Sequence, residues 1–312
     1  MGEGTHPRLD ALVTRARERV ATGAAPRIGI VYPGDVLALE AAARMHEAGI
    51  ATPVLIGPHS VIARAADAAK VDLRRFEVIE TADVPAEAAL RATTLARSGD
   101  LQALMKGSLH TEELMSAIVN KQTGLRGTTR ISHAFLFDLP RYPKLLALAD
   151  CVVNIAPDLK TKRDILGNAV RLLQALGIAR PKVGIVAAVE VISPAIPATL
   201  DAQALVELAR GGAWPGAIVD GPFGFDNAIS VEAARVKKID SVVPGDADLL
   251  LMPDLNAGNM LYKSFNYIGG GDCAGLVLGA TVPVMLTSRA DSLQSRIASV
   301  ALAVLVSPIR RS

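Results

Sequence analysis

Short aliphatic runs alternate along this chain with longer segments whose apolar residues recur every three or four positions. An aliphatic run bounded by turn residues is typical of a buried strand, and the wider spacing is typical of a helix packed by one face. The runs predict strands at 27–32, 53–58, 76–79, 132–137, 150–155, 183–188, 217–220, 248–252 and 282–286. The wider spacing predicts helices at 8–21, 36–48, 85–97, 112–120, 160–176, 202–210, 227–237, 256–265 and 291–305. Strands that alternate with helices throughout a chain place it in the α/β class.

The first supersecondary unit has the clearest punctuation. Between the strands predicted at 27–32 and 53–58, Asp35 can cap the helix 36–48 and Gly49 can end it. Two strands joined by one helix form a parallel pair with a right-handed crossover. The unit therefore predicts a parallel sheet at the start of the chain.

The length of 312 residues suits two lobes better than one small domain. Half of the residues are apolar and only 4% are aromatic, so the core must be built from Ala, Val, Leu and Ile. Such cores are typical of helix-covered parallel sheets. The segment 124–130 is polar, positively charged and contains glycine, and we interpret it as the first crossing between the lobes.

Composition narrows the classes of partner. A formal net charge of +2 without a block of Lys or Arg argues against nucleic acid. The two cysteines, Cys151 and Cys273, match no zinc spacing and predict a reduced, intracellular protein. The N-terminus has no basic region followed by an apolar core, and the apolar runs 274–286 and 297–307 are interrupted or too short to cross a bilayer. We therefore expect a cytoplasmic protein that binds neither nucleic acid nor membrane.

The sequence Ser288-Arg289-Ala290-Asp291 combines a helix start with a positive charge. Ser at the N-cap with Asp three residues later resembles a capping box, which is a purely structural role. The same helix start also offers unpaired N–H groups to an anion, and Arg289 adds a fork that can bind phosphate oxygens in pairs. The two roles are compatible, so Ser288 and Arg289 are candidates for a phosphate site.

Other polar residues also follow predicted strands. Asp226 and Asn227 come shortly after a strand, where they can cap the next helix or line a cleft. Asn154, Asn256 and Asn259 are amides at strand ends, and each can satisfy a turn as easily as a ligand. The residue types leave both roles open.

A turn at Lys106-Gly107 contains His110, the histidine that we place nearest to a site. The histidines do not cluster, and the sequence has no His-Glu-x-x-His, zinc or EF-hand spacing, so no metal site is predicted. A Walker A sequence is missing too. Neither a Gly-x-Ser-x-Gly sequence nor a Cys/His pair at a recognisable spacing indicates a covalent nucleophile.

Six stretches in order resemble the phosphate acetyl/butyryl transferases, which interconvert acyl-CoA plus phosphate with acyl phosphate plus CoA. The stretches are MKGSLHT (105–111), RISH (130–133), DCVVNIAP (150–157), DGPFGFDNAIS (220–230), PDLNAGN (253–259) and LTSRADS (286–292). The resemblance implies two three-layer α/β lobes with a cleft between them, as in isocitrate and isopropylmalate dehydrogenases. It also implies that the C-terminal helix returns to the first lobe, which gives lobe I as 1–127 plus 280–312 and lobe II as 128–279.

The resemblance also implies roles for residues. The family's Ser-Arg pair matches Ser288 and Arg289, with the serine directed at the thiol or the developing charge and the arginine holding phosphate or the acyl carbonyl. The other polar residues of the site are candidate contacts for substrate or CoA: Lys106, His110, Asn154, Asp226, Asn227, Asn256, Asn259 and Lys263. Coenzyme A is then a substrate rather than a bound cofactor, and a homodimer or a larger homo-oligomer is expected.

Two positions depart from the acetyl-specific branch. An aspartate seven residues after the family's serine is the proposed base for the CoA thiol, and Ser295 stands there in this chain. An arginine of that branch is replaced by Ala117. The Lys106-Gly107 turn and the Asp-Gly-Pro stretch are more similar to the butyryl branch. The acyl-chain length and the general base therefore stay open.

The leading hypothesis is a phosphate acyltransferase for a short acyl chain, acetyl or butyryl, working by direct transfer in a ternary complex. One alternative is a metal- and NAD(P)-dependent decarboxylating dehydrogenase of the same fold, which needs an aspartate cluster that the sequence does not show. Another is a non-catalytic protein that binds CoA or acyl phosphate, which the missing aspartate favours.

Overall fold

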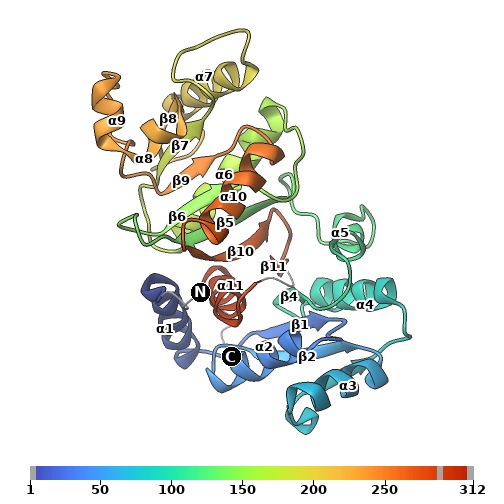
Figure 1. The fold of residues 1–312 in the computed structure, drawn as a ribbon. Coiled ribbons are helices and arrows are strands. Elements are labelled where there is room, and N and C mark those ends of the chain that lie inside the picture. Colours follow the sequence, from blue (N-terminus) through green and yellow to red (C-terminus); the bar gives the residue numbers. More distant parts are fainter. Residues whose placement is uncertain (1–4, 287–290, 308–312) are drawn as a thin grey trace. The chain divides into compact units, whose positions relative to one another are not determined.

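The computed structural model describes residues 5–286 and 291–307 and divides the chain into two compact units. The N-terminal unit comprises Pro7–Ile131 with Cys273–Ser312, and the central unit comprises Ser132–Asp272 with Met1–His6. Each unit carries strands of a mixed α/β sheet with helices on its faces (Figure 1). The α/β class is confirmed. The lobe boundaries after residues 127 and 279 stay a prediction.

The sheet of the N-terminal unit has the strand order β3-β2-β1-β4-β11-β10. Its strands are β1 (Arg27–Val31), β2 (Thr52–Gly57), β3 (Glu77–Glu80), β4 (Ala103–Lys106), β10 (Asp272–Leu278) and β11 (Val284–Met285). Neighbours from β3 to β11 run parallel, as the first supersecondary unit predicts, whereas β10 is antiparallel to β11. The carboxyl ends of five strands therefore share one edge of this unit.

Helices flank this sheet and bury their apolar residues against it or against one another. They are α1 (Pro7–Ala21), α2 (Val36–Glu47), α3 (His59–Ala69), α4 (Pro85–Ser98), α5 (Thr111–Val119) and α11 (Leu293–Val306), with a 3-10 turn at Leu73–Arg75. Helix α11 is buried on all sides and packs against α1 and α2, as Figure 1 shows for α1. Helix α11 thus belongs to the same unit as residues Pro7–Ile131.

The central unit has the strand order β5-β6-β9-β7-β8. Its strands are β5 (Ser132–Asp138), β6 (Leu146–Ala149), β7 (Lys182–Val186), β8 (Ile218–Phe223) and β9 (Leu249–Leu251). Its helices are α6 (Leu159–Ala175), α7 (Pro197–Arg210), α8 (Phe225–Ile229), α9 (Val231–Val236) and α10 (Leu255–Tyr267). Strand β5 is antiparallel to β6, and β6, β9, β7 and β8 are mutually parallel.

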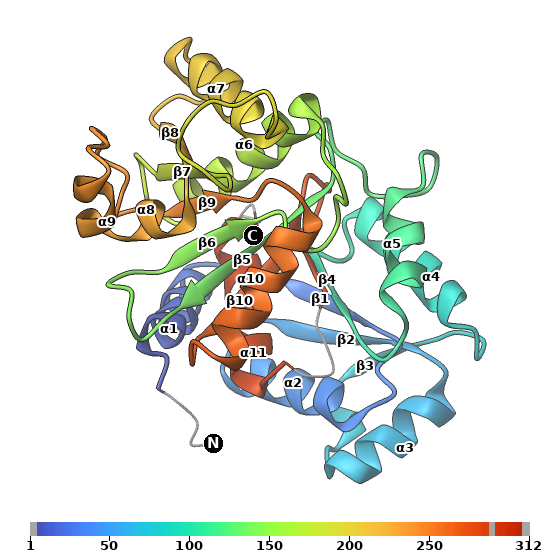
Figure 2. The same cartoon turned by 45° about the horizontal axis from the view of Figure 1, so that its top comes forward.

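The few aromatic residues gather where α10 meets β5 (Figure 2). Tyr262 stacks on Phe135 with ring centroids 4.2 Å apart, and Phe265 meets Phe137 edge-on at 5.2 Å. Aromatic pairs bury large areas and prefer these geometries. They fix α10 on the sheet and therefore fix where the start of α10 lies.

Several predicted elements need correction. Residues 150–155 are a turn rather than a strand, because the Asp150 carboxylate accepts the backbone N–H groups of Val152 and Val153; the strand is β6, which ends at Ala149. The helix predicted at 227–237 is two short helices, since Ser230 leaves helical geometry and caps α9. The strand predicted at 282–286 is shorter and consists of β11 alone. Strand β10, which precedes it, was not predicted as a strand. Helix α3 was not predicted at all.

Candidate active site

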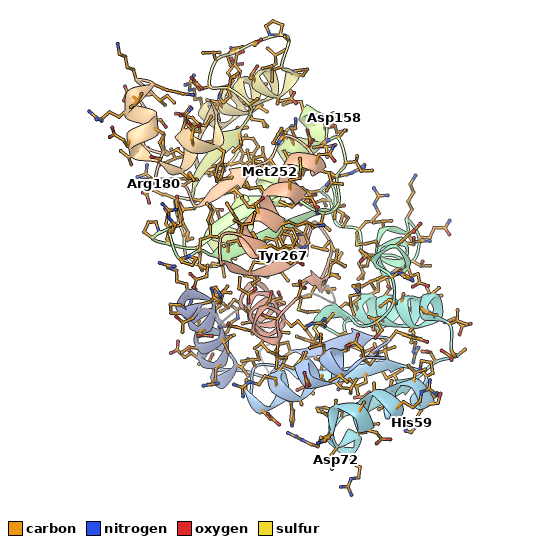
Figure 3. The ribbon with its side chains drawn as sticks, in the orientation of Figure 1. His59, Asp72, Asp158, Arg180, Met252 and Tyr267 are labelled. Carbon is orange, nitrogen blue, oxygen red and sulfur yellow. The ribbon has the colours of Figure 1, made fainter. Side chains whose placement is uncertain are left out.

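The parallel strands of the central unit end at one edge, and four loops follow them there. Loops at the carboxyl ends of parallel strands are where α/β proteins build binding sites. Figure 3 labels residues on two sides of this unit: Asp158 at the start of α6, after β6, and Arg180 just before β7. The predicted residues Asn154, Asn256 and Asn227 all lie in segments that follow these strands.

The loop after β6 is organised by the buried carboxylate of Asp150. One oxygen accepts the N–H groups of Val152 and Val153 at 2.8 and 3.0 Å, and the other accepts the Asn154 side-chain amide at 2.6 Å. Burial raises the pKa of the Asp150 carboxyl, and these donors partly offset the shift. The contact fixes the orientation of the Asn154 side chain.

Helix α10 begins against this same loop. Asp254 caps the helix by accepting the Ala257 N–H at 3.0 Å, and the Leu255 N–H donates to the carbonyl of Ile155 at 3.0 Å. Gly258 lies so close that a Cβ added there would be 2.6 Å from the Asp150 carbonyl oxygen. Only glycine allows this approach.

Two of the predicted stretches, 150–157 and 253–259, therefore form one connected surface. The Asn259 side-chain amide closes the contact by donating to the Cys151 carbonyl at 3.3 Å. Burial raises the pKa of the Cys151 thiol well above its ordinary value, so this cysteine stays protonated and unsuited to nucleophilic attack. The described side chains of this surface offer hydrogen bonds, and its cysteine is not a reactive nucleophile.

Asn256 and Lys263 lie on α10 beyond this contact. Both side chains are exposed. Positions 256, 259 and 263 are spaced by three and four residues, which places them on one face of the helix. A cation and two amides thus share the helix face that begins at the Asp150 loop.

The stretch after β8 is held by the carboxylate of Glu190. Asn227 is fully buried, and its side-chain amide donates to the Glu190 carboxylate at 3.2 Å. Lys237 also binds Glu190, at 2.9 Å, which lowers the pKa of that carboxyl. The Oδ1 atom of Asn227 is buried without a hydrogen-bond partner among the described residues. Asp226 beside it is exposed.

Sequence reasoning missed Glu190 and Lys237. Glu190 comes a few residues after β7, at the same edge as the other loops. Its position after a predicted strand was the one signal that could have singled it out, because the contact with Asn227 spans 37 residues.

In the N-terminal unit, Lys106 ends β4 and is buried. Its Nζ atom donates to the carbonyls of Gly107 and Leu109 at 3.1 and 3.2 Å. A Cβ on Gly107 would be 2.5 Å from the carbonyl oxygens of both Val31 and Tyr32, so the turn requires glycine. The Lys106 charge therefore stabilises a tight turn at the carboxyl edge of this unit.

The same turn is tied to the end of β1. The Ser108 hydroxyl donates to Asp35 Oδ2 at 2.8 Å and accepts the Gly34 N–H at 2.9 Å. His110 starts α5, where its backbone N–H donates to Glu113 at 2.8 Å and its imidazole is exposed. Lys106 and His110 thus belong to one turn, as the sequence suggested.

Ser288 and Arg289 lie outside the described residues. The described chain before them ends β11 at Met285, which pairs with Met105 beside Lys106. After them, Ser292 caps α11 by accepting the Ser295 N–H at 2.9 Å. The Ser295 hydroxyl is buried and donates to the carbonyl of Cys273, so it is committed to a structural contact.

Within residues 5–286 and 291–307, no group of three or more His, Cys, Asp or Glu side chains is arranged to hold a metal ion. The same residues form no helix long and apolar enough to span a membrane.

Comparison with known proteins gives the family. The sequence model described as "Phosphate acetyl/butaryl transferase" matches residues 83–304. A phosphate acetyltransferase of Rhizobium meliloti is 45% identical over 308 residues, covering 98% of this chain and 95% of that protein. A phosphate butyryltransferase of Clostridium acetobutylicum is 38% identical over 280 residues, covering 90% and 93%.

Solved structures agree with the sequence relatives. A branched-chain phosphotransacylase from Enterococcus faecalis V583 superposes with a TM-score of 0.78 at 28% identity, covering 90% of this chain and 98% of that one. A 4-hydroxythreonine-4-phosphate dehydrogenase from Burkholderia phymatum shares the fold with a TM-score of 0.54 at 14% identity, covering 92% and 99%. The family match spans more than half of the sequence and the relatives align over nearly their whole length, so this chain belongs to the phosphate acetyl/butyryl transferase family.

Proposed function

We propose that this protein transfers a short acyl group between coenzyme A and phosphate. The observation that carries the proposal is the 45% identity to a phosphate acetyltransferase over 98% of the chain. The connected surface formed by the stretches 150–157 and 253–259 supports it, because two of the six family-like stretches meet at a strand edge suited to ligands.

The reaction needs no covalent enzyme intermediate. A phosphate oxygen attacks the carbonyl carbon of the thioester, the C–O bond forms, the C–S bond breaks, and CoA leaves as the thiolate and takes up a proton. In the reverse direction the thiol loses its proton, and with a reference pKa of about 8.5 it can do so to water or to phosphate itself. Positioning and charge stabilisation then supply most of the catalysis.

Arg289 is proposed to hold phosphate, and Ser288 to hydrogen-bond the sulfur or the developing oxyanion. The buried hydroxyl of Ser295 donates to a backbone carbonyl, which agrees with a reaction in which this position does not act as a base. Lys106, His110, Asn154, Asp226, Asn227, Asn256, Asn259 and Lys263 remain proposed contacts for substrate or CoA.

The finer architecture is part of the same proposal. The two units would be three-layer α/β lobes of the isocitrate/isopropylmalate dehydrogenase type, with substrates bound in a cleft between them. The likeness to a 4-hydroxythreonine-4-phosphate dehydrogenase supports the fold class in this proposal. We also propose a cytoplasmic homodimer or larger homo-oligomer, with CoA as a substrate and no permanently bound cofactor.

The decisive experiment is phosphate-dependent release of CoA from acetyl-, propionyl- and butyryl-CoA, run with EDTA present. We expect release with at least one acyl-CoA, and the relative rates give the chain preference. Binding of CoA without release would favour the non-catalytic alternative. Oxidation of a hydroxy acid that requires a divalent metal and NAD(P) would favour the dehydrogenase.

Replacing Arg289 by Ala tests the assignment of the phosphate site. Loss of one charge-stabilising donor typically lowers turnover by about 10²-fold or more. We expect that decrease together with weaker phosphate saturation. Unchanged kinetics in a folded variant would remove Arg289 from the mechanism.

A further inference from the structure

A cleft of about 510 Å³ lies in the N-terminal unit, away from the turn that holds Lys106. It is lined by the last turn of α4, by the loop after α5, and by Thr281 and Val282 just before β11. Because Thr281 and Val282 precede a strand that is parallel to β4, the cleft faces the amino ends of the strands. The candidate active-site turn lies at the opposite, carboxyl ends.

The lining of this cleft is strongly basic. Arg97, Lys121 and Arg126 all contribute to it, and its lining includes no carboxylate. Within the described residues, none of the three forms an ion pair, although the chain has many such pairs elsewhere. Three like charges around one cavity repel each other, and a bound anion would relieve that repulsion.

Hydrogen bonds fix the main chain that carries two of these cations, Lys121 and Arg126, whose side chains are exposed. The Thr281 N–H donates to the Leu125 carbonyl at 2.8 Å, and the Gly127 N–H donates to the Gly279 carbonyl at 2.9 Å. These bonds flank Arg126, which bridges to Ala280. The Asn120 side chain accepts the N–H groups of Gln122 and Thr123 at 2.8 and 2.9 Å and so fixes the turn that carries Lys121.

Glycine makes this turn possible, since a Cβ on Gly124 would be 2.3 Å from the Asn120 carbonyl oxygen. Arg97 is anchored as well, because its guanidinium donates to the Gln122 carbonyl at 2.5 Å. A binding surface that is ordered before its ligand arrives loses less entropy on binding.

Helix ends account for only part of this charge. Arg97 and Lys121 lie near the C-termini of α4 and α5, where a cation favourably opposes the helix dipole. Arg126 instead lies on an extended segment paired with residues 279–281. Arg126 also lines the cleft, and its charge is not explained by the dipole of a helix.

We propose that this cleft binds a small molecule with two adjacent phosphate groups, at a site separate from the acyl-transfer site. Three cations match the charge of a diphosphate, and Arg binds phosphate oxygens in pairs. The volume is within the range of about 300–1,000 Å³ of small-molecule pockets. The ligand is either free diphosphate or the diphosphate of a nucleotide.

The test is equilibrium dialysis with radiolabelled inorganic pyrophosphate at low ionic strength, because exposed charges are screened by salt. The test variant is Arg97→Gln/Arg126→Gln, and the matched control is Arg91→Gln, an exposed arginine on α4 outside the cleft. We expect the double variant to bind pyrophosphate at least about tenfold more weakly than the wild type. The control should bind it unchanged.

Unlabelled ADP as a competitor separates the two sources. Competition at least about tenfold stronger than that of unlabelled pyrophosphate identifies a nucleotide site, and equal or weaker competition identifies a free-diphosphate site. Both results support the proposal. Pyrophosphate binding that the double variant leaves unchanged, in protein with a wild-type melting temperature, overturns it. Release of CoA by the double variant is measured separately, so failure of this site is distinguishable from failure of the proposed function.

Discussion

Asp150 in the central unit and Asp35 in the N-terminal unit both come after a strand, and the carboxylate of each accepts hydrogen bonds through both of its oxygens. Asp150 is 3% exposed and binds donors no more than four residues away. Asp35 is half-buried and caps α2 through the Ala38 N–H, but its other oxygen accepts the Ser108 hydroxyl, 73 residues later. Asp150 therefore stabilises a single loop, whereas Asp35 connects the loop after β1 to the turn after β4.

The difference predicts unequal costs when each carboxylate is removed. Asp150→Ala leaves two part-buried backbone N–H groups and the buried Asn154 amide without their acceptor, which should lower the free energy of unfolding by about 3 kcal/mol or more. Asp35→Ala removes a half-buried helix cap and one hydroxyl contact, and we expect a loss of about 1–2 kcal/mol.

Urea unfolding measures both losses. Trp214, the one tryptophan, is buried in the central unit, so its fluorescence follows that unit, while circular dichroism follows the whole chain. Asp150→Ala should shift the Trp214 transition. Equal destabilisation by the two variants would show that burial does not distinguish the two aspartates.

Each of these turns is also approached closely by a glycine. Alanine at Gly258 would place Cβ 2.6 Å from the Asp150 carbonyl oxygen, and alanine at Gly107 would place it 2.5 Å from the carbonyls of Val31 and Tyr32. Overpacking against backbone costs about 1–3 kcal/mol. We expect both variants to lose stability and, because each turn lies in the proposed site, to raise the KM for CoA.

Gly211→Ala is the control for both glycines. Its φ of −75° suits any residue, and the nearest atom would be 3.4 Å from the new Cβ. Its stability should stay within about 0.5 kcal/mol of the wild type. A Gly258→Ala protein as stable as this control would mean that α10 can move away from the Asp150 loop.

What the sequence could predict follows the same division between local and distant contacts. The cap at Asp35 and the Lys106 turn depend on residues a few positions apart, and both were predicted. The run Val152-Val153 was interpreted as a strand, because its β-branched residues outweighed a turn that only the burial of Asp150 stabilises.

Contacts between segments that are distant in the sequence could not be predicted from sequence patterns. Glu190 meets Asn227 only because β7 and β8 are neighbours in the sheet. Ser295 is bound to Cys273, 22 residues before it, and no spacing rule indicates such a contact. The family resemblance selected stretches of the chain, and the fold decided which of their side chains meet.

The central unit also has a buried base, which the pH dependence of stability should show. His133 on β5 is 1% exposed, its Nδ1 has no partner among the described residues, and burial lowers its pKa to about 3. In the unfolded chain His133 has a pKa near 6.5 and binds a proton that it does not bind in the folded chain. Stability therefore falls as pH decreases from about 6.5 toward 3.

From pH 7.5 to 5.5 the loss should be about 1.4 kcal/mol. Urea unfolding followed by Trp214 at the two pH values measures it, and His133→Leu is the comparison because it removes only this titration. A pH dependence that the variant leaves intact would assign the effect to other groups. The Asp150 carboxyl is not among them, because burial raises its pKa and a raised carboxyl pKa makes stability increase as pH falls.

The smallest effect on stability is expected at Lys263, and it separates the binding face of α10 from its packing face. The side chain is exposed and shares a helix face with Asn259, so Lys263→Gln should leave the unfolding midpoint unchanged. If this face binds CoA phosphates, loss of one cation should raise the KM for CoA by about five- to tenfold with little change in kcat. Arg180→Gln, an exposed arginine just before β7 in the same unit (Figure 3), is the matched control and should change neither constant. A KM for CoA that is equal in the two variants would remove Lys263 from the site, and the amides that meet the Asp150 loop would remain as its candidates on α10.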